Sequence, residues 1–130
     1  MSTFNAIGVA GTGVTVYRKW LDAVSDNIAN IDNVSRTSEK AFQARYVVAQ
    51  EAQDGNGAEV GGVAFGSAQG ILTYDPENPL ADAKGYVRRP DIDLGGQMAQ
   101  MMMAQRAYQA NLAVVDRAKD SYTAAINLGK

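Results

Sequence analysis

The last third of the chain places apolar side chains at alternating intervals of four and three residues. This spacing selects Leu94, Met98, Met101, Gln105, Tyr108, Leu112, Val115, Lys119, Tyr122 and Ile126. Eight of these ten side chains are apolar, and the spacing keeps them on one face of an α-helix. We therefore predict a helix over residues 94–127 and term its apolar face the C-terminal seam.

The first thirty residues repeat this spacing less regularly. It selects Phe4, Ile7, Gly11, Val14, Arg18, Leu21, Ser25 and Ile28, and it predicts a helix over residues 4–30. Neither apolar face is stable in water along its whole length. Because the chain must travel out and return between the two segments, we expect the helices to pack antiparallel, with Leu21 and Ile28 facing the C-terminal seam.

The middle of the chain is typical of short strands and loops. It contains all three prolines, which are costly inside helices. Strand-forming residues dominate 44–51 and 63–74, and two glycines interrupt the second run. The sequence DGNG at 54–57 predicts a turn, and the two prolines of YDPENP at 74–79 predict a loop.

These patterns together predict a fold that is mainly α. Its centre is an antiparallel coiled coil of long N- and C-terminal helices, with a short β- and loop-rich segment between them. We expect residues 1–34 and 94–130 to form one domain of paired terminal helices. Residues 35–93 would form an extended, β- and loop-rich insertion.

Composition narrows the function. The chain has 130 residues and a net charge of −2, which argues against a nucleic-acid partner bound by phosphate neutralisation. It has no cysteine and no histidine, so thiol nucleophiles, disulfides and histidine triads are excluded. No apolar run approaches the ~18 residues of a membrane span, and the N-terminus lacks the pattern of a cleaved signal peptide. We predict no enzyme activity, no cofactor and no membrane insertion.

Two short motifs fit helix starts better than ligand sites. Gly8, Gly11 and Gly13 hint at a phosphate-binding loop, but no strand precedes them and no P-loop lysine follows. We interpret them as a flexible or closely packed helix start. Asp91 and Asp93 resemble part of a calcium loop without its bidentate glutamate. We interpret them as acids near the positive end of a helix dipole.

Other polar and sulfur-containing side chains have a simple interpretation beside a functional one. The acids of the 75–82 loop are interpreted as solvated carboxylates rather than an acid–base pair. Arg88 and Arg89 are interpreted as a solvated pair rather than a phosphate site. Met102 and Met103 fall beside the C-terminal seam, which favours contact of these adaptable side chains with another chain.

Three stretches resemble one protein family. DNIANIDNV at 26–34 resembles the Asn-x-x-Asn signature of flagellar rod and hook proteins, and MAQRAYQANLAVVDRAKD at 103–120 resembles the Arg-Ala-Tyr-x-Ala-Asn motif of their C-terminal helix. LTYDPENPLADAKGYVRRPDIDLGGQM at 72–98 resembles the segment particular to proximal-rod subunits. The similarity covers nearly the whole chain in the family's order. Gln97 stands where a glutamate is usual, and Asp91 where an asparagine is usual.

The resemblance implies a structural subunit of the flagellar basal-body rod, the periplasmic shaft that transmits torque. Export would use the flagellar type III apparatus without a cleaved signal peptide. The implied partners are other flagellar rod subunits and neighbouring basal-body proteins, with self-assembly within the rod. The alternative function is a small non-catalytic helical adaptor that binds one partner through its coiled coil.

We assign assembly to side chains of the resembling stretches. They are Asn27, Asn30, Tyr74, Asp75, Pro76, Tyr86, Arg106, Tyr108, Asn111 and Leu112. Asn27 and Asn30 share a helix face, where their amides either cap the helix end or bridge to a neighbour. Arg106 and Asn111 lie beside the C-terminal seam and suit directional bonds that set helix register. Tyr108 lies on the seam itself.

Overall fold

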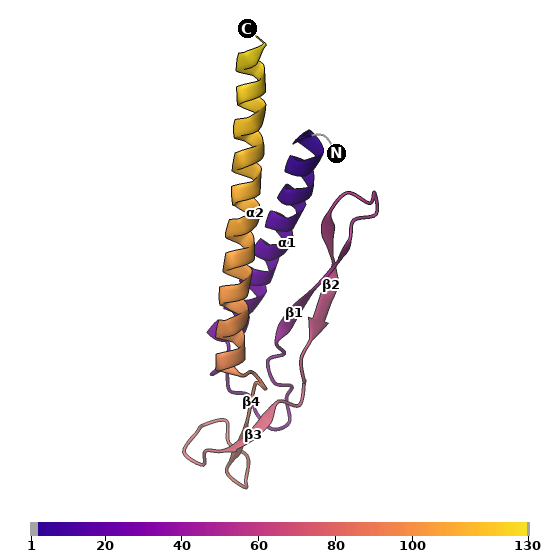
Figure 1. The fold of residues 1–130 in the computed structure, drawn as a ribbon. Coiled ribbons are helices and arrows are strands. Elements are labelled where there is room, and N and C mark those ends of the chain that lie inside the picture. Colours follow the sequence, from indigo (N-terminus) through magenta and orange to yellow (C-terminus); the bar gives the residue numbers. More distant parts are fainter. Residues whose placement is uncertain (1–2, 130) are drawn as a thin grey trace. The chain divides into compact units, whose positions relative to one another are not determined.

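The chain begins and ends with a long helix, and four short strands lie between the two helices in the sequence. The computed structural model describes residues 3–129. The elements are α1 (Thr3–Ala29), β1 (Arg45–Glu51), β2 (Ala58–Phe65), β3 (Ile71–Tyr74), β4 (Tyr86–Arg89) and α2 (Leu94–Leu128) (Figure 1). About half of the chain is helical, and small antiparallel hairpins occupy the middle. The predicted fold class is confirmed.

The strands form two separate two-stranded sheets. β1 pairs with β2, and β3 pairs with β4 in antiparallel register from Ile71 opposite Arg89 to Tyr74 opposite Tyr86. The run at 63–74 is therefore two strands, because β2 ends at Phe65 and β3 begins at Ile71. Sequence patterns did not predict β4. The predicted turn at 54–57 is confirmed, because these residues lie in a loop closed by the bond from the Ala52 N–H to the Gly57 carbonyl, 3.0 Å long.

The residues divide into two compact units. The first comprises the described residues of 1–21, 47–62 and 102–130, and the second comprises 22–46 and 63–101. Each helix is divided between the two units. Each unit is described by itself below.

In the first unit the two helices run antiparallel, as predicted. The Phe4 ring lies 4.7 Å from the Tyr122 ring, centroid to centroid. Further along α1, a Cβ added to Gly13 would lie 2.8 Å from the Asn111 Oδ1 of α2. Residue numbers thus rise on α1 while they fall on α2. Gly13 is the one glycine of its motif in close contact here, so the interpretation as a closely packed helix segment is confirmed at this position.

The second unit has a small core built from several elements. Val24 of α1 and Val87 of β4 are fully buried, and Ala41 and Ala44 of the connecting segment are nearly so. Gly70 closes the loop before β3 at φ +57°, where an added Cβ would collide with the Arg89 carbonyl. A side chain at this position would be strained in both backbone conformation and space.

The prediction that the C-terminal seam is the buried face of α2 is only partly correct. Three of its members, Met101, Tyr108 and Val115, are half-buried, whereas Leu94, Met98, Gln105, Leu112, Lys119, Tyr122 and Ile126 are exposed. The more enclosed line of α2 instead adds Gln97, Ala104 and Asn111, which recur every seven residues. The physical reason is space, because small side chains let helix backbones approach closely, and large apolar ones then occupy the flanks of the contact.

The corresponding shift occurs on α1. Leu21 and Ile28 are half-buried, while the fully enclosed positions of this stretch are Val24 and Asn27. The prediction from hydrophobicity alone therefore chose Leu21 and Ile28, which lie beside the line of side chains that is buried. Among the described residues 3–129, neither helix is long and apolar enough to cross a membrane.

Candidate assembly site

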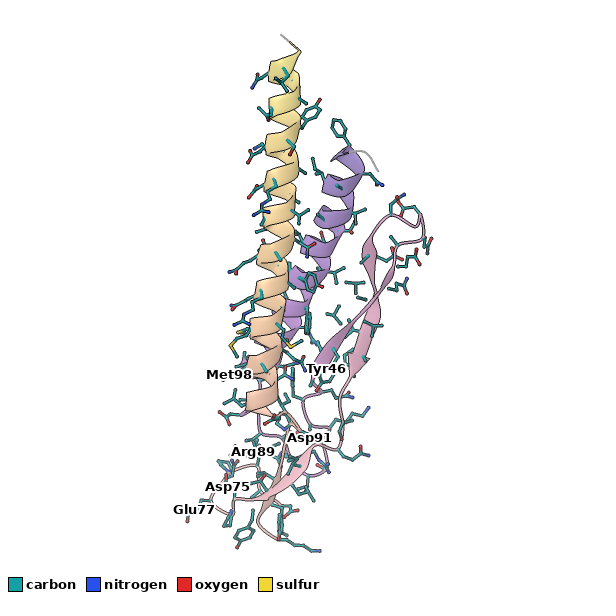
Figure 2. The ribbon with its side chains drawn as sticks, in the orientation of Figure 1. Tyr46, Asp75, Glu77, Arg89, Asp91 and Met98 are labelled. Atoms are coloured by element: carbon teal, nitrogen blue, oxygen red, sulfur yellow. The ribbon has the colours of Figure 1, made fainter. Side chains whose placement is uncertain are left out.

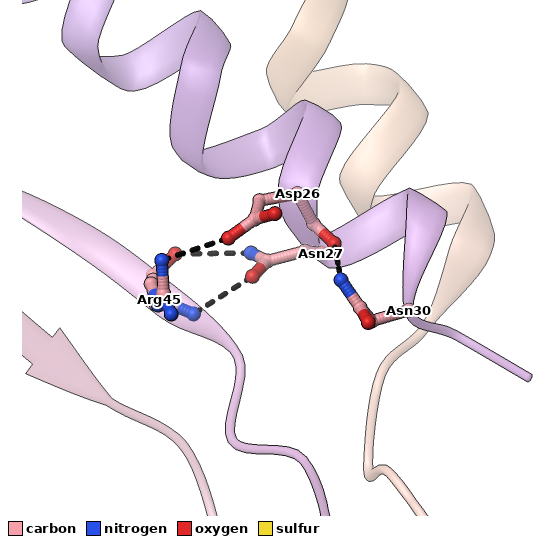
Figure 3. Close-up of polar contacts among 4 residues, drawn as sticks. All are labelled: Asp26, Asn27, Asn30 and Arg45. Atoms are coloured by element: carbon pink, nitrogen blue, oxygen red, sulfur yellow. Dashed lines mark hydrogen bonds and ion pairs between the residues drawn. The ribbon is translucent and has the colours of Figure 1, made fainter. Parts of the chain in front are cut away.

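Asn27 lies at the centre of a buried polar network in the second unit. Its Nδ2 donates to the Arg45 carbonyl at 2.9 Å and to Gln97 Oε1 at 3.0 Å. Its Oδ1 accepts the Arg45 backbone N–H at 2.8 Å (Figure 3). The Asn27 side chain is 0% exposed and Gln97 is 3% exposed. The three bonds of the Asn27 amide thus connect segments of this chain, and the predicted bridge to a neighbour stays a prediction.

Asn30 takes the other predicted role. Its Nδ2 donates to the Asp26 carbonyl at 2.8 Å, just past the end of α1 at Ala29 (Figure 3). The same carbonyl also accepts the Asn30 backbone N–H at 3.2 Å, so the side chain and the backbone of Asn30 both bond to the last turn of the helix. Beside it, the Arg45 guanidinium lies 2.8 Å from the Asp26 carboxylate. Both side chains are about half exposed, so this ion pair contributes less than about 1 kcal/mol.

Gln97 is placed by the start of α2. The Asp93 carboxylate accepts the Gly96 N–H at 2.7 Å, and the Asp93 carbonyl accepts the Gln97 N–H at 3.0 Å. Asp93 is thus the N-cap of α2, which confirms the interpretation of this acid as part of a helix start. Among residues 3–129, no group of three acidic side chains is placed to hold a metal ion.

A second predicted group meets on the β3–β4 hairpin. The rings of Tyr74 and Tyr86, which are opposite each other in the register, lie 5.4 Å apart at an interplanar angle of 65°. Both tyrosines are exposed, and so is Pro76. Asp75 is half-buried: its N–H donates to the Gly85 carbonyl at 2.8 Å, and its carboxylate accepts Asn78 Nδ2 at 3.1 Å. The predicted loop at 74–79 begins at Tyr74, the last residue of β3, and its residues Asp75 and Glu77 are labelled in Figure 2.

Asp82 organises the rest of this hairpin loop. Its Oδ1 accepts the backbone N–H groups of Tyr86 at 3.0 Å and Lys84 at 2.8 Å, and its Oδ2 accepts the Thr37 hydroxyl at 3.2 Å. These bonds, that from Tyr86 most of all, hold the pKa of Asp82 below its ordinary value. The carboxylate is therefore a structural acceptor, not a free loop acid.

The interpretation of Arg88 and Arg89 as a solvated pair was wrong. The Arg88 guanidinium donates to the carbonyls of Thr37, at 2.7 Å, and of Gln69. Its backbone exchanges two 2.9 Å bonds with Ser35. Both arginines are half-buried. They lie on β4, the strand that sequence patterns missed, and the pairing of that strand turns their side chains toward neighbouring loops.

The four predicted residues of α2 have different surroundings. Arg106 and Leu112 are exposed, and Tyr108 is half-buried. Asn111 is half-buried opposite Gly13 of α1, and its Nδ2 donates to the Ala107 carbonyl at 2.9 Å. Asn111 therefore lies at the contact of the two helices in the first unit, while its amide bonds to its own helix.

An open apolar groove of about 460 Å³ lies within the first unit. Tyr17 and Trp20 of α1 line one side, with their rings 6.1 Å apart, and Val47 and Ala49 of β1 line the other. The groove shows that β1 does not seal the surface of α1. The two aromatic rings are half-buried in this chain.

The predicted residues thus form separate groups rather than one site. Asn27 and Asn30 belong to one network, the hairpin residues to another, and the α2 residues spread over several faces of that helix. Sequence reasoning missed Arg45, which carries no signal because its backbone makes the bonds to Asn27. It also missed Gln97, whose position in the heptad line of Ala104 and Asn111 is a usable signal.

The arrangement defines a class: a small helical subunit with exposed apolar side chains along its longest helix, as in proteins that assemble with other chains. Comparison with known proteins agrees. Residues 83–128 match the family model described as flagellar basal body rod FlgEFG protein C-terminal. Flagellar basal-body rod protein FlgC of Escherichia coli O6:H1 is 37% identical over 134 aligned positions that cover all of both chains.

Other relatives carry the same name. The FlgC proteins of Salmonella typhimurium and Bacillus subtilis are 35% and 26% identical, each with complete coverage of both chains. The chain therefore belongs to the FlgC family of flagellar basal-body rod proteins, which are structural, non-catalytic rod subunits.

Proposed function

We propose that this chain joins the proximal rod through its terminal helices, residues 1–34 and 94–130, while residues 35–93 form an insertion on that axial domain. The observation that carries the proposal is the exposed apolar surface of α2. Leu94, Met98 and Leu112 are exposed on one flank of the enclosed line, and Met103 and Val114 on another. Side chains of this kind favour burial against other chains.

Met98 illustrates this surface. It belongs to the predicted seam, yet its side chain is exposed on α2 (Figure 2). Met102 and Met103 are exposed as well. Methionine is flexible and polarisable, so a methionine-rich flank adapts to the differing surfaces of neighbouring subunits. This supports the expectation that Met102 and Met103 contact another chain.

The assigned residues divide by exposure. Exposed members suit direct contact with neighbours: these are Tyr74, Pro76, Tyr86, Arg106 and Leu112. Enclosed or half-enclosed members maintain the shape that presents them: these are Asn27, Asn30, Asp75, Tyr108 and Asn111. Under this proposal the first group determines partner choice, and the second group determines the geometry of the subunit.

The proposed partners are other rod subunits, further copies of this chain and neighbouring basal-body proteins. A shaft grows through heterologous contacts, in which one surface of a subunit binds a different surface of the next. The apolar flanks of α2 provide two such surfaces. The proposed location is the periplasmic rod, reached through the flagellar type III apparatus without signal cleavage, where the assembled subunits transmit torque.

A charge placed on one flank tests the proposal. Leu112→Asp puts a carboxylate at a side chain that is 38% exposed. Because the covered part of the leucine is lost, the isolated chain should lose about 1–2 kcal/mol of stability and still fold. Ala113→Asp is the matched control, because it adds the same charge one residue along the same exposed helix. We expect Leu112→Asp to abolish rod completion and swimming, and Ala113→Asp to leave them largely intact.

Basal-body purification and swimming assays measure both outcomes. Sedimentation with purified rod subunits adds a test of assembly type, because a rod subunit forms open, growing assemblies, whereas an adaptor stops at a closed stoichiometry. Complete rods in Leu112→Asp cells, or a closed complex of fixed size, would contradict the proposal.

A further inference from the structure

The hydrogen bonds of Asn27 determine the orientation of two buried amides. The Arg45 N–H can only donate, so the Asn27 atom 2.8 Å away is Oδ1. The Arg45 carbonyl can only accept, so the atom 2.9 Å away is Nδ2. The second hydrogen of Nδ2 then requires an acceptor, and Gln97 presents Oε1 at 3.0 Å.

These bonds connect three segments that are far apart in the chain. Asn27 lies in the last turns of α1, Arg45 is the first residue of β1, and Gln97 lies in the first turn of α2. The amide of Asn27 pairs with both backbone groups of Arg45, as the backbone of a neighbouring strand would. The connection over 30–44 contains no regular helix or strand. Single backbone bonds tie it to the β segments, such as the 2.8 Å bond from the Gly66 N–H to the Ala44 carbonyl. The Asn27 amide ties the next residue, Arg45, to the two helices.

The Asn27 end of these bonds is shielded from water. Asn27 is fully enclosed, and Val24 on the same helix and Ala44 next to Arg45 in the chain are buried as well. A buried polar group that loses its partner keeps its desolvation cost without compensation. The three bonds are therefore specific as well as stabilising, because an apolar or differently charged side chain leaves backbone groups of Arg45 without a partner.

We infer that Asn27 and Gln97 form a buried amide junction that determines where the middle segment leaves the helix pair. Asn27 is then a positioning residue for rod assembly and not a contact to another subunit. The existence of the junction does not depend on the proposed function. Only its role in positioning residues for rod assembly rests on that function. A subunit that transmits torque needs its insertion held firmly to its helices, and this junction is one direct connection.

The Arg45 amide proton reports on the junction in the full-length chain. Asn27→Leu keeps the size of the side chain and removes all three bonds. We expect amide exchange at Arg45 to accelerate at least about tenfold in this variant, as the loss of a buried bond network requires. Asn30→Leu is the matched control, because Asn30 belongs to the same motif but its side chain donates to the Asp26 carbonyl rather than to Arg45 or Gln97. It should leave Arg45 exchange nearly unchanged.

A second pair of variants keeps the test decisive if Asn27→Leu does not fold. Gln97→Glu keeps an acceptor for Asn27 Nδ2, whereas Gln97→Met keeps the length and removes it. We expect Gln97→Met to accelerate Arg45 exchange at least about fivefold, the equivalent of one lost hydrogen bond. Gln97→Glu should restore near-normal exchange and swimming, while Gln97→Met should impair swimming.

Val87→Ala supplies the measure of general destabilisation, because Val87 is buried in the same unit without a bond to the junction. If Val87→Ala or Asn30→Leu accelerates Arg45 exchange as much as Asn27→Leu, the junction is overturned. If Gln97→Glu behaves like Gln97→Met, it is also overturned. If exchange responds as expected but Gln97→Met cells swim normally, the positioning role is overturned, whereas the proposed function depends on the separate Leu112→Asp result.

Discussion

The helices are held in different ways in the two units. In the second unit their contact includes the amides of Asn27 and Gln97, which are enclosed and hydrogen-bonded. In the first unit the contact includes small side chains such as Gly13, and it ends in an aromatic pair whose Phe4 ring is 62% exposed. Both units leave apolar side chains in water, Leu72 and Met98 among them in the second unit. The difference lies in the contact between the helices, which includes hydrogen-bonded amides in the second unit and an exposed aromatic ring in the first.

This difference indicates which part of the subunit is complete before assembly. The Asn27 amide uses both of its donors and its acceptor within this chain, so it needs no further partner. Phe4, Leu112 and Ile126 are exposed. Burial of their exposed apolar surface against another chain would lower the free energy of the assembled state. We therefore expect the second unit to keep its structure in the isolated chain, and the first unit to gain order as the rod forms. The predictions below are arranged by the size of the expected effect.

Ala107→Pro should have the largest effect and should break the first unit. Ala107 lies in the middle of α2, where proline removes a backbone donor and collides with the preceding turn, at a cost of about 3 kcal/mol or more. We expect rod completion and swimming to be lost while cell growth continues. Basal bodies purified from the variant, compared with those of Ala107→Ser, provide the measurement. Complete rods would show that a continuous α2 is not required.

Val87→Ala should weaken the second unit in the isolated chain. Val87 is fully buried, so the lost burial and the remaining cavity should lower the free energy of unfolding by about 2 kcal/mol. Val114→Ala removes the same atoms from an exposed position of α2 and should cost less than about 0.5 kcal/mol. Urea denaturation measures both. Equal losses would mean that the second unit has no core of its own.

Acid should loosen the β3–β4 loop of the second unit. Because the folded pKa of Asp82 lies below its ordinary value, its contribution to stability is present above the unfolded pKa. It is lost as the pH falls through the folded pKa, below about 4. Amide chemical shifts of Lys84 and Tyr86 should follow this titration. Asp82→Asn keeps an acceptor but cannot titrate, so a persisting acid transition at these amides would exclude Asp82 as its source.

Glu59→Ala should have the smallest effect on stability and motility of the substitutions considered. The Glu59 carboxylate of β2 accepts Gln50 Nε2 at 2.8 Å in an exposed contact of the first unit. Such surface contacts contribute little, and we expect a change within about 0.5 kcal/mol. Thermal unfolding and swimming should both resemble those of the unmodified chain. A large loss of motility would place a subunit contact on the β1–β2 hairpin.

Several features could be predicted from the sequence because they depend on neighbours along the chain. The three–four spacing predicted both long helices, and prolines and glycines predicted the turn at 54–57 and the loop at 74–79. The acids before α2 predicted its start, where Asp93 is the cap. β4 was missed because four residues with two arginines carry little strand signal, and only pairing with β3 makes that strand.

What the sequence by itself determined is the type of each element and the presence of apolar faces, because side-chain period and backbone preference act locally. The tertiary structure decided which line of each helix is enclosed, since close packing selected Ala104 and Gly13 over larger apolar neighbours. It also decided the role of Asn27. That amide meets partners 18 and 70 residues away, and no local pattern specifies bonds between segments so distant in the chain.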